Sequence, residues 1–430
     1  MIRFSYRRRI AIGVAAALGA ALAALGQAPS SSGYTWEQIK ERFLAVNPTL
    51  IAARASIDES RAAEITAFLR PNPEFGITAD GFQLAPNAGI WQPVSGVVIT
   101  PSISYLHERQ HKRELRLDSA KKSTDVTQSQ YADQMRNLLY TLRNAFVQVL
   151  NAKAVLGNAT ENLNYWDREL VINRNRYTAG DLAQLDLQKL ELQRVQFETD
   201  YQNALLSLRT NKIQMQTMIL DRSSHEEFDV QGRYDYDEKL APLETFRTTA
   251  LETRPDLKAA VQNVELARVN HQLAIANGST DPTFSVWYSR NASFSNPFAN
   301  NTAGFSVSIP FRIFDRNQGE KARTQLDIGR NERLREGVEA QVFSDVDTAY
   351  VTMQQSLNLL GRYKTVYLPM ADNVRNKTRD AFQHGGSSLL DYLDSEKSYR
   401  DTNLNYINFI GSYLTAAAQM NQAVGKEVMP

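Results

Sequence analysis

Two segments carry residue types that could do chemistry, and the first matches a zinc-peptidase signature. His107-Glu108-Arg109-Gln110-His111 fits the pattern H-E-x-x-H, in which two histidines bind zinc and the glutamate acts as a base. The context argues against this chemistry, because Lys112 and Arg113 follow where a buried catalytic helix would carry apolar residues. No H-x-x-G-x-x-H extension follows either. We therefore predict neither a metal site nor any other cofactor for this chain.

The second segment is acidic and begins a predicted helix. Asp391 and Asp394 are three residues apart, so both carboxylates can point the same way from one helical face. A paired arrangement of this kind suits a functional site. The plainer interpretation is an exposed helix start, where acidic side chains meet the positive end of the helix dipole. The residues alone leave both interpretations open.

The composition excludes several classes of protein. The 430 residues carry a formal net charge of +1, without the basic stripe and interleaved aromatic residues expected of a nucleic-acid-binding surface. The chain has no cysteine, which excludes disulfides, thiolate metal sites and cysteine nucleophiles. No run of about 18 apolar residues follows the N-terminal segment, so helical membrane spans are not expected there.

The chain repeats its own pattern, and this duplication sets the architecture. The two copies stand about 205 to 209 residues apart, in the order helix, strand pair, long helix, glycine turn, helix. The matching segments include Asn47-Pro48-Thr49-Leu50 with Arg254-Pro255-Asp256-Leu257, and Pro73-Glu74-Phe75 with Pro282-Thr283-Phe284. We predict a first repeat over residues 29–220, a linker over residues 221–244, and a second repeat over residues 245–430.

Each repeat is predicted to hold two strands and very long helices. The strand candidates are Phe75–Phe82, Val94–Tyr105, Phe284–Ser289 and Phe305–Phe311, and all but the second alternate apolar and polar residues clearly. The second is ambiguous. Its own apolar residues predict one face, but matching Pro101 to Pro310 predicts that the same residues lie on the opposite face. The helix from about Glu108 to Tyr177 has a heptad seam and would extend roughly 100 Å. The second copy repeats this seam less strictly.

These elements need partners. A helix with a heptad stripe must pack against other helices, and four strands are too few to close a barrel by themselves. Closure by several subunits would satisfy both requirements and would also remove the exposed strand edges that lipid does not tolerate.

The N-terminus has the pattern of a secretory signal peptide over residues 1–28. Arg7, Arg8 and Arg9 precede an alanine-rich apolar stretch, Ile10–Leu25, and small residues beyond it offer cleavage points. A single membrane anchor is the alternative, although the stretch is short for a spanning helix.

The two glycine turns carry a resemblance to a known family. The first reads Arg176-Tyr177-x-x-Gly180-(x)5-Asp186-Leu187, and the second reads Phe382-x-x-Gly385-(x)5-Asp391. With the repeated architecture, they resemble the TolC family of outer-membrane efflux ducts, and Arg70-Pro71-Asn72-Pro73 is most similar to its heavy-metal branch. The resemblance implies a mixed α/β, mostly α fold. The resemblance further implies a homotrimer with a 12-stranded outer-membrane β-barrel, four strands from each chain, continuing into a long periplasmic α-helical barrel.

The resemblance also implies a gate at the periplasmic end of the duct. In the family, aspartates that match Asp391 and Asp394 ring the closed aperture, where carboxylates from three chains would favour cations. The first-copy aspartate, here Asp186, bonds in the family to a tyrosine and an arginine of the second turn. Those positions are Phe382 and Ser387 in this chain. The hydroxyl and the guanidinium group of the usual polar lock are therefore missing, and closure is expected to depend more on packing.

The glycine turns themselves are expected to form the periplasmic tip. Gly180 and Gly385 supply the positive φ that a tight helix-to-helix turn requires. With Tyr177 beside the first glycine, they are the candidate contacts for a periplasmic adaptor.

The predicted function is that of an outer-membrane exit duct in a tripartite efflux system, conducting heavy-metal cations or drugs passively and catalysing nothing. The implied partners are a periplasmic adaptor of the membrane fusion class, an inner-membrane pump of the RND type, and outer-membrane lipid, with no nucleic acid. Two alternatives stand beside this prediction. One is a secreted zinc metallopeptidase using His107 and His111. The other is a periplasmic coiled-coil adaptor or scaffold, which leaves the alternating strands without a role.

Overall fold

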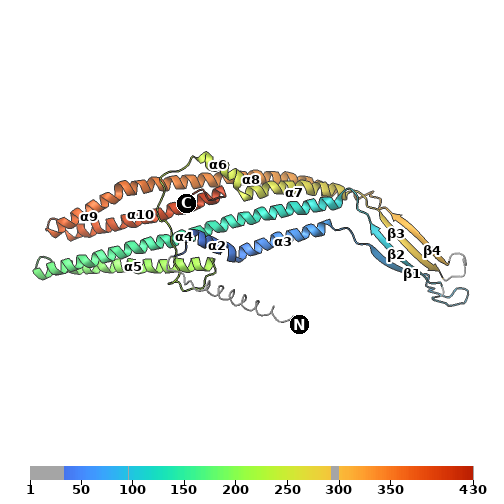
Figure 1. Ribbon diagram of the computed structural model, residues 1–430, viewed down its shortest axis with the longest axis horizontal. Coiled ribbons are helices and arrows are strands. Elements are labelled where there is room, and N and C mark those ends of the chain that lie inside the picture. The colour runs from blue at the N-terminus through green and yellow to red at the C-terminus, as the bar shows by residue number, and fades with distance from the viewer. Residues whose placement is uncertain (1–32, 95, 292–299, 430) are drawn as a thin grey trace, which may run out of the picture. The chain divides into compact units, whose positions relative to one another are not determined.

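The computed structural model describes residues 33–94, 96–291 and 300–429, and the predicted signal peptide, residues 1–28, lies outside them. Figure 1 labels the elements. In chain order they are α2 (Trp36–Val46), α3 (Pro48–Phe68), β1 (Glu74–Asp80), β2 (Val98–Leu106), α4 (Lys112–Ala179), α5 (Gln184–Met218), α6 (Leu243–Thr253), α7 (Pro255–Asn277), β3 (Thr283–Asn291), β4 (Asn301–Ser308), α8 (Gln318–Arg362), η1 (Tyr363–Tyr367), α9 (Leu368–Gln383) and α10 (Leu389–Val424).

The chain forms two compact units that do not coincide with the two predicted repeats. Unit 1 comprises the described parts of Met1–Asn47, Leu138–Leu240 and Val351–Gln419. Unit 2 comprises the described parts of Pro48–Asn137, Ala241–Tyr350 and Met420–Pro430. Each unit takes segments from both repeats, and α4, α8 and α10 contribute residues to both units.

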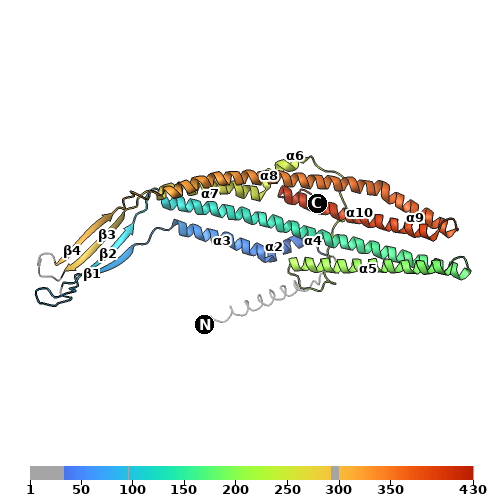
Figure 2. The ribbon, with the colours of Figure 1, turned by 180° about the vertical axis from the view of Figure 1, so that it is seen from behind.

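The strands of unit 2 form one antiparallel sheet in the order β1-β2-β3-β4, which can be followed in Figure 2. The register pairs Phe75 with Ile103, Ile103 with Val286, and Val286 with Phe305, so an apolar row crosses all four strands. The two rows beside it belong to the other face, and they pair Ser102 with Trp287 and Ser104 with Ser285. One face of the sheet is therefore apolar, and the other carries mostly small polar residues, with the ring of Trp287 among them.

The register also settles the phase of β2. Pro101 pairs with Ile77 and stands on the apolar face together with Ile99, Ile103 and Tyr105. The phase suggested by matching Pro101 to Pro310 is wrong, because two prolines at corresponding places in two repeats need not face the same side of a sheet.

A buried ion pair joins the sheet of unit 2 to the start of α4. The side chain of Lys112 is only 4% exposed, and its Nζ lies 2.6 Å from Asp281 Oδ2. Asp281 precedes β3 and also accepts a hydrogen bond from the backbone N–H of Arg109 at 2.9 Å. Buried charges require partners of this kind, and the pair fixes the junction between strand and helix.

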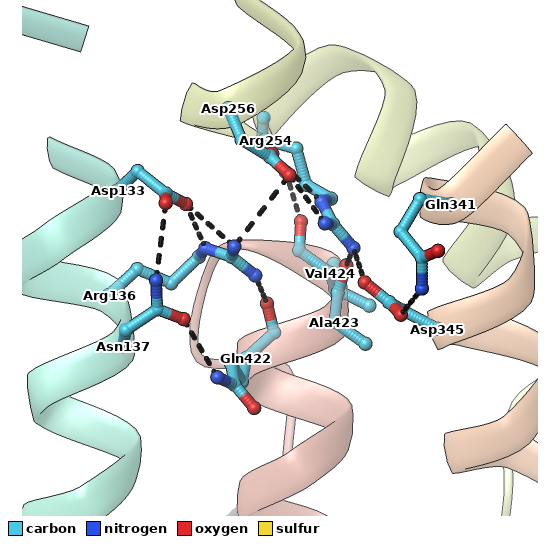
Figure 3. Close-up of polar contacts among 11 residues, drawn as sticks. Asp133, Arg136, Asn137, Arg254, Asp256, Gln341, Asp345, Gln422, Ala423 and Val424 are labelled. Atoms are coloured by element: carbon cyan, nitrogen blue, oxygen red, sulfur yellow. Dashed lines mark hydrogen bonds and ion pairs between the residues drawn. The ribbon is translucent and has the colours of Figure 1, made fainter. Parts of the chain in front are cut away.

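The last turn of α10, which belongs to unit 2, is anchored by Arg136 of α4 and by Arg254, which lies between α6 and α7 (Figure 3). Arg136 donates to the carbonyl of Gln422 at 2.5 Å, and Arg254 donates to the carbonyl of Ala423 at 3.3 Å. The final carbonyls of a helix lack partners within the helix and carry the negative end of its dipole. The two guanidinium groups donate hydrogen bonds to these carbonyls, and their positive charges compensate the negative end of the dipole. Arg254 in turn contacts Asp256 at 2.5 Å and Asp345 at 2.7 Å.

Unit 1 contains two helical hairpins, α4 with α5 and α9 with α10, whose helices lie side by side in both views (Figures 1 and 2). Their turns place Gly180 at φ +83° and Gly385 at φ +78°. These values lie in the left-handed region that a Cβ disfavours, and they explain why the repeated glycines stand at these two points.

The second long helix is interrupted, unlike the first. One π-helical turn, Tyr363–Tyr367, separates α8 from α9. Pro369 lies in the first turn of α9 and has no N–H to donate, which shifts the hydrogen bonds of the preceding turn to a wider spacing. The looser heptad pattern of the second copy did not reveal this interruption. Among the described residues, no helix is both long enough and apolar enough to cross a membrane.

Candidate functional site

Both glycine turns close the ends of their helices in the same way. The N–H of Asp181 donates to the carbonyl of Arg176 at 2.8 Å, and the N–H of Gly386 donates to the carbonyl of Ala381 at 2.7 Å. These are the long capping bonds of a helix that ends in a left-handed residue. Tyr177 at the first turn is 40% exposed. The two turns thus present short, exposed loops on rigid helical hairpins.

Asp391 has a local structural role at the second turn. Its Oδ2 accepts hydrogen bonds from the hydroxyl of Ser388 at 2.7 Å and from the backbone N–H of Ser388 at 3.3 Å. The Ser388 hydroxyl accepts a bond from the Asp391 N–H at 3.2 Å, which completes a capping box at the start of α10. The Ser388 hydroxyl, with its backbone N–H, holds the pKa of Asp391 below its ordinary value. Ser387 lies 3.5 Å from the same carboxylate oxygen.

Asp391 and Asp394 both lie on the exposed side of α10. The residues between and after them, Tyr392, Ser395 and Glu396, are buried. The capping role of Asp391 engages one carboxylate oxygen and leaves the side chain exposed. The geometry is thus compatible with both interpretations of this acidic pair.

Asp186 is separate from these groups. Its carboxylate lies 3.4 Å from Lys189 Nζ, one turn along α5. Within the described residues, no ion pair or hydrogen bond joins it to Phe382 or Ser387. The structure therefore does not bring the predicted first-copy aspartate together with the second turn inside one chain.

Phe382 belongs to an aromatic column that crosses all four helices of the two hairpins. Its ring stacks on Tyr392 of α10, with centroids 5.1 Å apart. Tyr392 stacks on Trp166 of α4 at 6.1 Å, and Trp166 stacks on Phe197 of α5 at 5.0 Å. The rings are almost fully buried. Offset stacking of this kind adds to the free energy gained by burial, so apolar contact holds the hairpins together.

Four polar side chains, three buried and one half-buried, lie beside this column, and sequence reasoning missed them. Tyr165 donates to Glu396 at 3.0 Å, and Tyr392 donates to Glu169 at 3.4 Å. Each pair joins α4 to α10. A signal was present, because tyrosine and glutamate stand four residues apart in both helices, which places them on one face. The heptad seam drew attention to apolar positions only.

The H-E-x-x-H segment does not form a zinc-peptidase site. Helix α4 begins only at Lys112, and Gln110 and His111 have φ values of +60° and +55°. The two histidines therefore do not occupy successive turns of one helix. Glu108 accepts two hydrogen bonds from Arg116, one of them at 2.8 Å, so its carboxylate is engaged in an ion pair. Among the described residues, no group of three metal-binding side chains occurs.

The sheet of unit 2 exposes an unusual amount of apolar side-chain surface. Phe305 is 80% exposed, Phe75 68% and Val286 58%. The other large apolar residues exposed on this face are Ile77, Ile99, Ile103, Phe284, Tyr288 and Val307. A contiguous apolar face of this kind marks a surface that another apolar medium covers. The opposite face carries hydroxyl groups, among them Thr100, which donates to Ser289 at 3.2 Å.

Comparisons with known proteins agree with this architecture. The family model described as "Outer membrane efflux protein" matches residues 40–219 and 247–426. The chain is 23% identical to the cobalt-zinc-cadmium resistance protein CzcC of Cupriavidus metallidurans, covering 88% of this chain and 87% of that protein. It is also 23% identical to the outer membrane protein TolC of Vibrio cholerae, covering 91% and 89% respectively.

Among solved structures, the fold is similar to that of CusC. The TM-score is 0.76 at 16% identity, and the match covers 91% of this chain and 92% of that one. The family model matches both halves of the chain and most of its length. The chain therefore belongs to the outer membrane efflux protein family, as a TolC-like protein of the outer membrane whose helical part lies in the periplasm.

Proposed function

We propose that this chain is one of three identical subunits of an exit duct through the outer membrane. The observation that carries the proposal is the two-faced sheet of unit 2. Its apolar face is exposed in the single chain, with Phe305 80% and Phe75 68% exposed. Its other face holds mainly small hydroxylated residues, together with Trp287. Three such sheets joined edge to edge would turn the apolar faces to lipid and the hydroxyl groups to an aqueous pore.

The edges of the sheet support closure by other copies. β1 and β4 are its outer strands, and each has only one neighbour in the chain. Unpaired backbone groups cannot face lipid, because each would lose its hydrogen bond without replacement. Pairing β1 of one subunit with β4 of the next would satisfy these groups. We therefore place lipid and two further copies of this chain among its partners.

The acidic pair at the start of α10 is the proposed aperture. Asp391 and Asp394 lie on the exposed side of the helix, and three chains would gather their carboxylates in one constriction. A ring of this kind attracts cations and repels anions. Asp186, Phe382 and Ser387 are proposed to set how the tip closes, with Phe382 acting through stacking because it has no hydroxyl group.

The tip turns are the proposed docking point for a periplasmic adaptor. Tyr177, Gly180 and Gly385 lie at the two hairpin ends, where Tyr177 and the neighbouring Leu185 and Leu390 expose their side chains. An inner-membrane pump of the RND type would supply the energy, because conduction through the duct is passive. Metal cations are the favoured substrate class, since CzcC is named for cobalt, zinc and cadmium resistance and a carboxylate ring suits cations.

Single-channel conductance in planar bilayers tests this proposal. We expect the wild-type chain to form cation-preferring pores and the double variant Asp391→Asn with Asp394→Asn to lose much of that preference. Asparagine keeps a helix-capping oxygen, so the turn should survive. Asp58→Asn on α3, whose side chain is 68% exposed, is the matched control and should leave conduction unchanged. Absence of any pore would overturn the duct, and unchanged selectivity in the double variant would overturn the aperture.

A further inference from the structure

The two hairpins of unit 1 are joined by a reciprocal pair of hydrogen bonds. Helix α4 carries Tyr165 and Glu169, and helix α10 carries Tyr392 and Glu396. Tyr165 donates to Glu396 Oε1 at 3.0 Å, while Tyr392 donates to Glu169 Oε2 at 3.4 Å. Each hairpin therefore gives one donor and one carboxylate to the other. The four side chains are called the clamp below.

Three of the four clamp side chains are buried, and Tyr165 is half-buried. Glu396 is 4% exposed, Glu169 is 7% exposed, and Tyr392 is fully buried against Trp166 in the aromatic column. Neither carboxylate forms an ion pair with any described residue, because the nearby arginines bond elsewhere. Arg375 donates to Asp372 at 2.9 Å, and Arg379 lies 3.7 Å from Asp380. A carboxylate such as Glu396, buried without an ion pair, is costly to keep charged.

The charged and titratable groups around Glu396 come from three helices. Tyr165 and Glu169 face it from α4, Arg375 and Arg379 face it from α9, and Tyr392 lies on its own helix. The buried side chains that α5 contributes to this core, Leu190 and Phe197, are apolar, and Arg194 of α5 pairs with Asp167 of α4. The charges of the two arginines therefore oppose the effect of burial without cancelling it.

Burial raises the pKa of Glu396 to about 7 from an ordinary value near 4.5, against the opposing effects of Arg375 and the Tyr165 hydrogen bond. Burial also raises the pKa of Tyr165 to about 12. It raises the pKa of Tyr392 as well, so both phenols remain protonated donors at ordinary pH. The group that changes its charge near neutral pH is the Glu396 carboxyl.

We propose that the clamp is a proton-operated latch that holds the two hairpins of a subunit together in acid and loosens them as pH rises through neutrality. The regulatory consequence rests on the proposed duct function. A latch between hairpins next to the tip would favour a closed duct when the surroundings are acidic. The latch would release the hairpins when Glu396 becomes charged, because a charged carboxylate is more stable in water than in the buried site.

The direction follows from proton linkage. If the hairpins separate, Glu396 meets water and its pKa returns towards 4.5. The joined hairpins bind the proton more tightly than the separated ones. The stability that this proton adds to the joined state is fully present below pH 4.5 and is lost as pH rises through about 7. Between pH 8 and pH 6 the ratio of joined to separated hairpins should rise about tenfold.

Hydrogen exchange on the full chain in detergent tests the latch without requiring conduction. After correction for the intrinsic pH dependence of amide exchange, peptides that contain Tyr165–Leu170 and Tyr392–Glu396 should be about tenfold better protected at pH 6 than at pH 8. Glu396→Gln imitates the neutral acid and should protect them at both pH values. Glu191→Gln, a half-exposed glutamate on α5 that pairs with Arg174, is the control and should behave as wild type.

A second variant keeps the test decisive if Glu396→Gln folds poorly. The hydrogen bond from Tyr165 lowers the pKa of Glu396, so Tyr165→Phe should move the midpoint of the transition to higher pH. Equal protection of the wild type at pH 6 and pH 8 would overturn the latch, as would an unshifted midpoint in Tyr165→Phe.

Conductance of the same proteins separates the latch from the duct. If the latch controls the tip, the wild type should be open about tenfold less often at pH 6 than at pH 8, and Glu396→Gln should stay closed at both. Pores without any pH effect on protection would remove the latch and keep the duct. The expected protection pattern without any pore would support the latch between the hairpins and overturn the duct.

Discussion

The rings of Phe382 and Tyr392 lie nearly parallel, with centroids 5.1 Å apart and an angle of 6° between their planes. Phe382 occupies the place where the family resemblance implies a tyrosine of a polar lock. In this chain the side chain is 7% exposed and has the Arg176 guanidinium 5.2 Å from its ring centroid. Phe382 has no hydroxyl group that could bond to Asp186. Its contribution to the contact between the hairpins is stacking on Tyr392.

Replacing Phe382 with alanine should weaken the junction between the hairpins. Loss of a buried phenylalanine side chain costs about 3–5 kcal/mol of folding free energy, and here the cavity would open beside Tyr392 and Trp166. We expect a lower thermal midpoint of the helical signal and a higher open probability in bilayers. Lys377→Ala, at an exposed position on α9, is the control and should change stability by less than about 0.5 kcal/mol. A fully stable Phe382→Ala variant would refute the structural role of the column.

Among the residues that hold the end of α10, Arg254 should cause the largest loss of stability when it is replaced. Its side chain is 2% exposed and contacts Asp256, Asp345 and the carbonyl of Ala423. Removing one partner of a buried pair leaves the other charges uncompensated, so Arg254→Ala should cost about 3–5 kcal/mol. Arg254→Lys should recover little, because an ammonium group lacks the planar fork that reaches all three partners. Denaturant unfolding measures both, with the exposed Arg268→Ala as control.

The same network should make unfolding sensitive to acid. Burial acts to raise the pKa of Asp256, but the Arg254 guanidinium outweighs it and holds the pKa below its ordinary value. Stability from this pair is therefore present above the ordinary carboxyl pKa and is lost as pH falls through the lowered one. This dependence has the opposite sign to that of the clamp. Asp256→Asn should remove it without changing the neutral-range behaviour of Glu396.

Much of the fold could be predicted from local pattern. The strand alternation and the repeated glycines depend on neighbouring residues, and the sheet register and the φ angles of Gly180 and Gly385 agree with them. The clamp could not be predicted in this way, because Tyr165 and Glu396 are 231 residues apart and meet only when two hairpins pack. The H-E-x-x-H segment is the converse case. Its spacing matches a zinc site, but the backbone at Gln110 and His111 is not helical.

The acidic pair shows why the site was harder to predict than the fold. Asp391 was open to two interpretations. Its capping box with Ser388 shows that it caps the start of α10. An aperture depends on how three chains meet, which no contact within one chain determines. The selectivity measurement on Asp391 and Asp394 therefore remains the deciding test for that residue pair.

Any side chain at position 180 should lower the stability of the folded chain. At φ +83° an alanine would be strained by about 1–2 kcal/mol even though nothing lies within 4 Å of the added Cβ. Gly157→Ala is the matched opposite, because Gly157 lies within α4 with open space beside it. That change should stabilise the chain by about 0.5–1 kcal/mol. Thermal unfolding of the two variants should therefore shift in opposite directions, and a shared direction would contradict the assigned turn.

The two faces of the sheet can be separated with neighbouring residues on β3. Val286 belongs to the apolar row and is 58% exposed, whereas Ser285 points to the polar face. Under the proposed duct, Val286→Arg places a charge against lipid and should cost about 2–4 kcal/mol near the bilayer midplane. Ser285→Arg places the same charge in the aqueous pore and should leave insertion intact while lowering cation conductance. The measurement is the yield of heat-resistant trimer in outer-membrane fractions, followed by conductance of the inserted protein. Equal insertion of both variants would mean that lipid does not cover the apolar face.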